Sequence, residues 1–163
     1  MNLSNLICAV FACALLFTPA ALADTDTDAI NQLLDGLHRD AATADFDSYF
    51  SRYTADAVFL GTDKSERWSI AAFKAYARPH FEAGQGWEYH PNERFIMGEG
   101  RLRWFDEELW SDNYGHCRGT GVVKKTNAGW RVAHYSLTFL IPNDVAAEAT
   151  ALGIAAEDAS ATP

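Results

Sequence analysis

The sequence predicts an α+β domain in which three helices precede an antiparallel β-meander. The first observation is a set of apolar residues at helical spacing near the N-terminus, such as Ile30, Leu33 and Leu37. The second is a change to a two-residue period after Gly86. The third is a series of short separators rich in Gly, Asn and Asp: GEG (98–100), SDNY (111–114) and TNAG (126–129). Helices followed by hairpin-linked strands indicate a sheet with one face buried beneath the helices.

The individual elements follow from these periods. Helices are predicted over 24–42, 46–53 and 69–77, and Pro79 is expected to end the third. Thr25 or Thr27 can cap the first helix, where Asp26 and Asp28 suit the positive end of the dipole. A short strand is predicted over 57–60, a loop over 61–68, and meander strands over 87–97, 101–110, 115–125 and 130–141. The Ala-rich tail, 146–163, is expected to contribute a short helix near 145–152.

The first 23 residues are typical of a secretory signal peptide. Their apolar run, 6–17, is short for a membrane span, and the triplet Ala21-Leu22-Ala23 fits a cleavage site. We therefore expect a mature chain that starts at Asp24, is periplasmic or secreted, and has no stable membrane anchor. A retained anchor is the alternative, because the segment before the apolar run has no Lys or Arg.

Charge and cysteine content exclude several classes of function. The net charge of −9 argues against nucleic acid and anionic membranes as partners. Without the signal peptide, Cys117 is the sole cysteine, so no intrachain disulfide is expected. The histidines show no metal-binding spacing, and no glycine-rich phosphate loop follows a strand. We expect neither a metal nor a cofactor.

The hairpin turns predict which side chains share a face of the sheet. If the turn at 111–114 pairs Trp110 with Gly115, Glu107 lies directly opposite Arg118. Large apolar residues fall on the same face as this pair, so the ion pair is expected inside a largely apolar pocket. A one-residue bulge would exchange the faces of a strand and bring Asp106 inward instead.

Several motifs resemble one known family. GTDKSERW, FKAY, GWEYHP, WFDE, CRGTGV, GWRVAHY and IPND, in this order over about 27–145, are similar to the SnoaL-like branch of the NTF2-like superfamily. The resemblance implies an α+β cone over 24–145, in which three helices pack into a bent antiparallel sheet that opens to a pocket. It also implies a domain that is often dimeric. It implies no single reaction, because this superfamily includes both enzymes and pure binding domains.

The site residues are predicted from the expected faces. As a catalytic residue, Glu107 would act as a base or orient Arg118, which would bind a carboxylate or enolate oxygen. Tyr135 would donate to a developing oxyanion, and Asp106 would be the base if the register shifts by one residue. The alternative is a structural Glu107–Arg118 pair that only specifies register. The remaining candidate ligand-binding residues are Trp68, Tyr76, Phe105, His116 and Thr120.

The expected function is an exported small-molecule-binding domain. As an enzyme it would catalyse cofactor-free proton transfer on an apolar carbonyl compound, such as isomerisation or cyclisation. The alternative is a non-catalytic ligand-binding or dimerisation domain. In either case a homodimer is expected, formed through the half-apolar outer face of the sheet.

Overall fold

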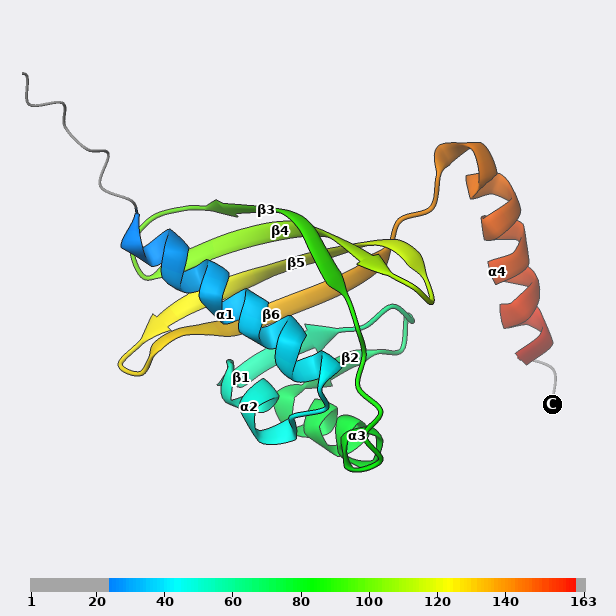
Figure 1. Cartoon of the computed structure of the whole chain (residues 1–163). Helices are drawn as coiled ribbons and strands as arrows, with labels where there is room; N and C mark the ends of the chain where they lie inside the picture. Colours follow the sequence, from blue (N-terminus) through cyan, green and yellow to red (C-terminus); the bar gives the residue numbers. More distant parts are fainter. Residues whose placement is uncertain (1–23, 161–163) are drawn as a thin grey trace, which may run out of the picture.

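The computed structural model describes residues 24–160, and the predicted signal peptide lies outside the described residues. The helices are α1 (Thr25–Ala42), α2 (Phe46–Ser51), α3 (Ile70–Glu82) and α4 (Ala146–Ser160), with a 3-10 turn, η1, at Asn143–Val145. The strands are β1 (Tyr53–Leu60), β2 (Arg67–Ser69), β3 (His90–Met97), β4 (Leu102–Ser111), β5 (Gly115–Thr126) and β6 (Gly129–Phe139). The predicted α+β cone is confirmed, with three helices before the meander (Figure 1).

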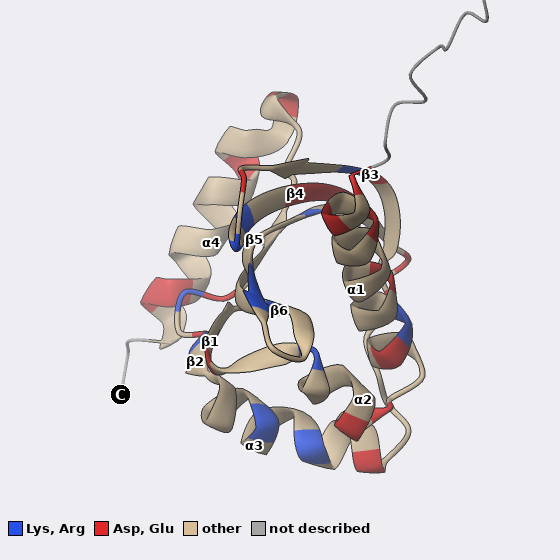
Figure 2. Cartoon of the chain, turned by 90° about the vertical axis from the view of Figure 1, so that its left-hand side faces the viewer, with Lys and Arg blue, Asp and Glu red and all other residues tan. Residues whose placement is uncertain are grey.

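The strands form one curved sheet in the order β2-β1-β6-β5-β4-β3. The meander β3 to β6 is antiparallel, as predicted, but β1 pairs with β6 in parallel, so the sheet as a whole is mixed rather than antiparallel. Strand β2 pairs with β1 and begins within the segment 61–68 that was predicted to be a loop. Figure 2 shows β3 to β6 curving around one side of the domain, with α1 on the opposite side.

The core lies between the helices and the inner face of the sheet. Ile30, Leu34 and Leu37 of α1 are buried, as their spacing predicted. Phe73 of α3 is almost fully buried and stacks on Phe59 of β1, with ring centroids 4.1 Å apart. Figure 2 shows mainly acidic residues along α1 and α2, with a basic residue in the last turn of α1, and basic residues along α3.

The α3 helix continues past Pro79 to Glu82, so the predicted end of this helix is wrong. Proline removes one backbone hydrogen bond within a helix. Here the following turn buries Phe81, whose ring contacts Tyr49 and Trp87. We attribute the continuation of the helix to this aromatic packing, which offsets the lost hydrogen bond.

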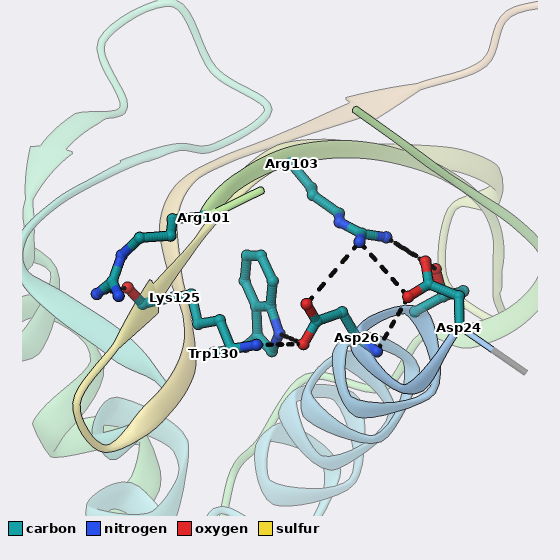
Figure 3. Close-up of polar contacts among 7 residues, drawn as sticks. Asp24, Asp26, Arg101, Arg103, Lys125 and Trp130 are labelled. Atoms are coloured by element: carbon teal, nitrogen blue, oxygen red, sulfur yellow. Dashed lines mark hydrogen bonds and ion pairs between the residues drawn. The ribbon is translucent and has the colours of Figure 1, made fainter. Parts of the chain in front are cut away.

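The first turn of α1 is attached to the sheet by a polar cluster (Figure 3). Asp24 caps the helix by accepting from the Asp26 amide, and its carboxylate pairs with Arg103 of β4. Asp26 accepts hydrogen bonds from Lys125 Nζ at 2.6 Å and from Trp130 Nε1 at 3.1 Å. These contacts fix where α1 crosses the sheet, and so fix the position of every side chain farther along the helix.

The C-terminal helix α4 is longer than the short helix predicted near 145–152. It buries none of its residues, and Leu152 and Ile154 are exposed. An ion pair of 2.8 Å between Glu157 and Lys64 joins the helix to the loop between β1 and β2. Within residues 24–160, no helix is both long enough and apolar enough to cross a membrane.

Candidate functional site

A buried carboxylate lies at the centre of the candidate site. Glu107 of β4 has no exposed surface and accepts three hydrogen bonds. His38 Nε2 and the Tyr135 hydroxyl each lie 2.8 Å from its Oε1, and Arg94 Nε lies 2.8 Å from its Oε2. We call these four residues the Glu107 network. They come from α1, β3, β4 and β6, so the network joins the helical layer to three strands.

The sheet register brings the four side chains together. Arg94 stands directly opposite Glu107 on the neighbouring strand β3. On the other side, β5 presents Gly119 opposite Glu107. A Cβ atom at Gly119 would collide with the Tyr135 hydroxyl and crowd the Glu107 side chain. The absence of a side chain on β5 therefore lets Tyr135 of β6 reach across to the carboxylate.

The network holds Glu107 in its ionised form. Burial on its own raises the pKa of a carboxyl group. Here the hydrogen bond from His38, the charge of its ring when protonated, the positive charge of Arg94 and the hydrogen bond from Tyr135 outweigh burial, and the pKa of Glu107 is lowered. Burial and the adjacent carboxylate raise the pKa of Tyr135 well above its usual value, so this hydroxyl remains a donor.

The carboxylate also selects the tautomer of His38. An ionised carboxylate only accepts hydrogen bonds, so Nε2 of His38 must carry the proton. Nδ1 is then a lone-pair nitrogen when the ring is neutral, and no hydrogen bond within residues 24–160 uses it. The side chain is 10% exposed and lies in the cavity wall. His38 can therefore exchange a proton with a bound molecule while Glu107 holds the opposite edge of the ring.

A cavity of about 220 Å³ lies beside the network, and we call it the aromatic cavity. His38 and the rings of Tyr135, Phe59, Phe73, Trp68 and Tyr76 all line it. Successive rings in this series are nearly parallel. The interplanar angles are 4° for Phe59–Tyr135, 18° for Phe59–Phe73, 5° for Trp68–Phe73 and 24° for Trp68–Tyr76. Such walls favour a flat apolar ligand.

A hydroxyl pair also faces the aromatic cavity. Tyr49 and Tyr53 both line it, and their hydroxyl oxygens lie 2.8 Å apart. In such a pair one hydroxyl donates to the other, which leaves the second proton available to another acceptor. Burial raises the pKa of both phenols above the usual value, so both keep their protons at neutral pH.

The predicted Glu107–Arg118 pair is wrong. Trp110 lies opposite His116 rather than Gly115, so Arg118 faces Glu108 and is exposed on the outer face. One feature of the chain causes the shift. The turn between β4 and β5 begins one residue later than expected, because Ser111 rather than Trp110 pairs with Gly115.

The other predicted site residues divide between the two faces of the sheet. Glu107 and Tyr135 are brought together inside the cone, and Trp68 and Tyr76 line the aromatic cavity. Phe105 is buried in the core but does not line the cavity. The structure places the remaining candidates on the outer face: Asp106, His116, Arg118 and Thr120.

Sequence reasoning missed two members of the network. His38 directly follows the buried Leu37 and lies four residues after Leu34, at the flank of the apolar stripe of α1. Arg94 lies two residues before Ile96, at the inward spacing of a strand whose pattern is mostly polar. Each position could have been noted as a polar residue bordering the core, but neither carries a motif. Their meeting at Glu107 depends on tertiary packing.

Among residues 24–160, no group of three or more His, Cys, Asp or Glu side chains is arranged to hold a metal ion.

Solved structures share this fold. A proposed aromatic ring hydroxylase from Novosphingobium aromaticivorans is 22% identical, with a TM-score of 0.60 over 72% of this chain and 91% of that chain. A proposed dehydratase of the NTF2-like family from Streptomyces avermitilis is 13% identical, with a TM-score of 0.60 over 73% and 99%. A proposed scytalone dehydratase from Novosphingobium aromaticivorans is 9% identical, with a TM-score of 0.60 over 72% and 85%. At these identities the likeness shows the fold alone.

The sequence gives the family assignment. No curated protein matches the chain. The model of the SnoaL-like domain matches residues 30–142, which include the whole Glu107 network and all six strands. The chain therefore belongs to the SnoaL-like domain family, and it shares its fold with solved NTF2-like proteins.

Proposed function

We propose that the domain binds a flat, apolar carbonyl compound in the aromatic cavity and catalyses cofactor-free proton transfer on it. The observation that carries the proposal is the setting of His38. An ionised carboxylate holds its Nε2, while Nδ1 has no partner among the described residues. A histidine in this setting can remove a proton next to a carbonyl group, and the carboxylate stabilises the imidazolium that forms.

The hydroxyl pair would supply the second half of the chemistry. Loss of a proton next to a carbonyl group places negative charge on the carbonyl oxygen. The unused proton of the Tyr49–Tyr53 pair is suited to stabilise that oxygen. Glu107, saturated by three donors and with a lowered pKa, is a positioning residue for His38 rather than the base. Asp106 lies on the outer face and has no part in this proposal.

Exchange of carbon-bound protons tests the proposal directly. β-Tetralone is a flat apolar ketone, and its deuterium uptake in heavy water can be followed by NMR. We expect the protein to accelerate uptake, and His38→Gln to lower the rate by about 10²-fold, the low end for one acid–base group. The glutamine amide retains a donor for Glu107 but has no basic nitrogen. His116→Gln, an exposed histidine on the outer face, is the control and should keep full activity.

One observation favours a second function, a binding domain without catalysis. Glu107 is fully hydrogen-bonded and its pKa is lowered, which also suits a network whose role is to hold α1 on the sheet. Under this function, calorimetry would detect β-tetralone binding while the exchange rate stayed at the buffer value. Equal rates for the wild-type protein and His38→Gln would likewise contradict the catalytic role of His38.

Export is a separate proposal, supported by the role of Asp24. The expected cleavage after Ala23 would leave Asp24 as the first residue, and this residue caps α1 and pairs with Arg103. Cleavage after Ala23 would therefore retain the side-chain contacts of the first helical turn, including those of Asp24. Intact-mass measurement of the protein recovered from the periplasm or medium should give a chain that begins at Asp24. Recovery of a full-length, membrane-bound chain would contradict the proposal.

A further inference from the structure

The charge of the aromatic cavity points to one class of ligand. Seventeen described residues line the cavity, and none of them is Lys or Arg. The carboxylate of Glu66, which lines the cavity together with Gly61 and Thr62, is the only acidic side chain among them. The lining therefore presents a fixed negative charge without any fixed positive one. A cleft lined by one sign of charge raises the local concentration of ligands with the opposite sign.

Glu66 has no cationic partner within the described part of the chain. Within that part of the chain, the Glu66 side chain accepts a single hydrogen bond, at Oε2 from the Asp63 amide at 3.2 Å. The nearby Lys64 forms an ion pair with Glu157 instead, with 2.8 Å between Nζ and Oε2. Arg67 precedes Trp68 in β2, and successive side chains of a strand point to opposite faces. Because Trp68 faces the cavity, the Arg67 side chain is directed away from it.

Aromatic residues line the same cavity as this carboxylate. Tyr89 and Tyr114 line the cavity with Glu66. Burial raises the pKa of Tyr89 to about 12, with the charges of Cys117, Tyr114 and Glu66 adding to the effect. Tyr and Trp rings attract cations through their faces, so they add to the preference of a carboxylate for a cation.

We propose that the ligand of the aromatic cavity carries a positively charged amine, and that Glu66 selects this amine against neutral and acidic compounds of the same shape. The inference rests on the proposed function in one respect, that the cavity binds a flat ligand. The substrate would then be an amino-substituted flat carbonyl compound, with its reacting carbon at His38 and its ammonium group at Glu66.

Three compounds with the same bicyclic body test the charge preference. Naphthylmethylamine is a cation at neutral pH, naphthalenemethanol is neutral, and naphthoate is an anion. By isothermal titration calorimetry we expect the amine to bind about tenfold more tightly than the alcohol, and the acid to bind more weakly than the alcohol by a similar factor. Equal affinities, or tightest binding of naphthoate, would overturn the proposal, and so would failure of all three to bind.

Two matched variants assign the preference to Glu66. Glu66→Gln keeps an oxygen for the Asp63 amide but removes the charge, so the affinities for amine and alcohol should become equal while that for the alcohol is retained. Glu88→Gln is the control, because Glu88 lies between the lining residues Trp87 and Tyr89 but is exposed and does not line the cavity. The proposal fails if both variants lose the preference for the amine over the alcohol to the same degree. It also fails if Glu66→Gln weakens binding of the alcohol as much as binding of the amine.

The outcome is separable from that of the proposed function. A protein that exchanges β-tetralone protons through His38 but shows no amine preference would retain the proposed function and lose this inference. A protein that selects the amine through Glu66 but leaves the exchange rate at the buffer value would retain the inference and lose the catalytic role of His38.

Discussion

At the scale of single residues, Glu107 makes the site depend on pH. Its pKa is lowered in the folded chain, so its contribution to stability is present above the unfolded pKa of about 4.3 and is lost as the pH falls through the folded value. Protonation would remove the charge that pairs with Arg94 and the acceptor that orients His38. Stability should therefore decline in acid, below about pH 4.3.

Glu107→Gln tests this dependence. We expect a loss of about 2 kcal/mol in the free energy of unfolding at pH 7, because Arg94 loses its buried partner and keeps only its ion pair with the exposed Asp35. Urea unfolding should also show a flatter decline of stability below pH 4.3 than in the wild-type protein. Tyr135→Phe should have a smaller effect, because it removes one hydrogen bond to Glu107. We expect it to lower the free energy of unfolding by about 1 kcal/mol. An unchanged acid profile in Glu107→Gln would contradict the linkage.

Gly119 allows a sharper residue-scale prediction. A methyl group at this position collides with the Tyr135 hydroxyl, so Gly119→Ala should displace Tyr135 from Glu107. We expect a destabilisation of about 2 kcal/mol, as for other overpacked cores, measured by urea unfolding. Gly153→Ala in the exposed helix α4 is the control, because its methyl group meets no atom within 4 Å. Alanine is favoured in helices, so the control should be neutral or slightly stabilising.

At the scale of elements, the sequence predicted the helices and the meander but not the way they meet. The stripe of α1 and the alternation of β4 arise from local periods, and both are observed. The inward face of β5, which includes Cys117 and Gly119, was predicted outward, because one residue in a turn changes the face of a whole strand. Glycines add no hydrophobic signal that would have revealed the correct register.

The same limit applies to the candidate site. Glu107 and Tyr135 could be placed inside the cone, because their strands carry clear apolar alternation. The partners of Glu107 could not, because His38 and Arg94 are brought to it by the packing of α1 and by the pairing of β3. A charged residue gives no local sign of which opposite charge it will meet in the fold. The partner Arg118 was therefore assigned from an assumed register, and it was wrong.

The attachment of α1 gives an element-scale prediction. Asp26 joins the first turn of the helix to Lys125 and Trp130 of the β5–β6 hairpin. Asp26→Asn weakens both contacts, so amide hydrogen exchange should become faster in the first turn of α1 but not near His38 in its last turns. Asp28→Asn is a matched control in the same turn, because Asp28 is exposed and its carboxylate makes none of the cluster's hydrogen bonds or ion pairs among the described residues. If hydrogen exchange in the first turn becomes equally faster in both variants, the loss of a negative charge at the helix N-terminus, rather than the loss of the contacts to the hairpin, explains the effect.

At the scale of the whole molecule, the outer face of the sheet exposes large aromatic side chains on neighbouring strands. Phe95, Trp104 and Trp110 are 52%, 51% and 43% exposed on neighbouring strands β3 and β4. Phe95 lies opposite Asp106, and Arg118 lies opposite Glu108, so the aromatic residues are interspersed with both signs of charge. An exposed apolar patch with a charged surround is typical of a protein–protein contact. A symmetric pair of copies would set acids of one copy against bases of the other.

We propose that two copies associate through this face, and the prediction can be tested by native mass spectrometry. The wild-type chain should give a dimer, and Trp104→Glu should give a monomer, because a charge would be buried at the centre of the contact. Leu152→Glu on α4 is the control. Leu152 is 67% exposed, even more than Trp104, so the substitution adds the same charge outside the outer sheet face and should leave the dimer intact. A wild-type monomer would contradict the proposal. Loss of the dimer in Leu152→Glu alone would instead place the contact on α4.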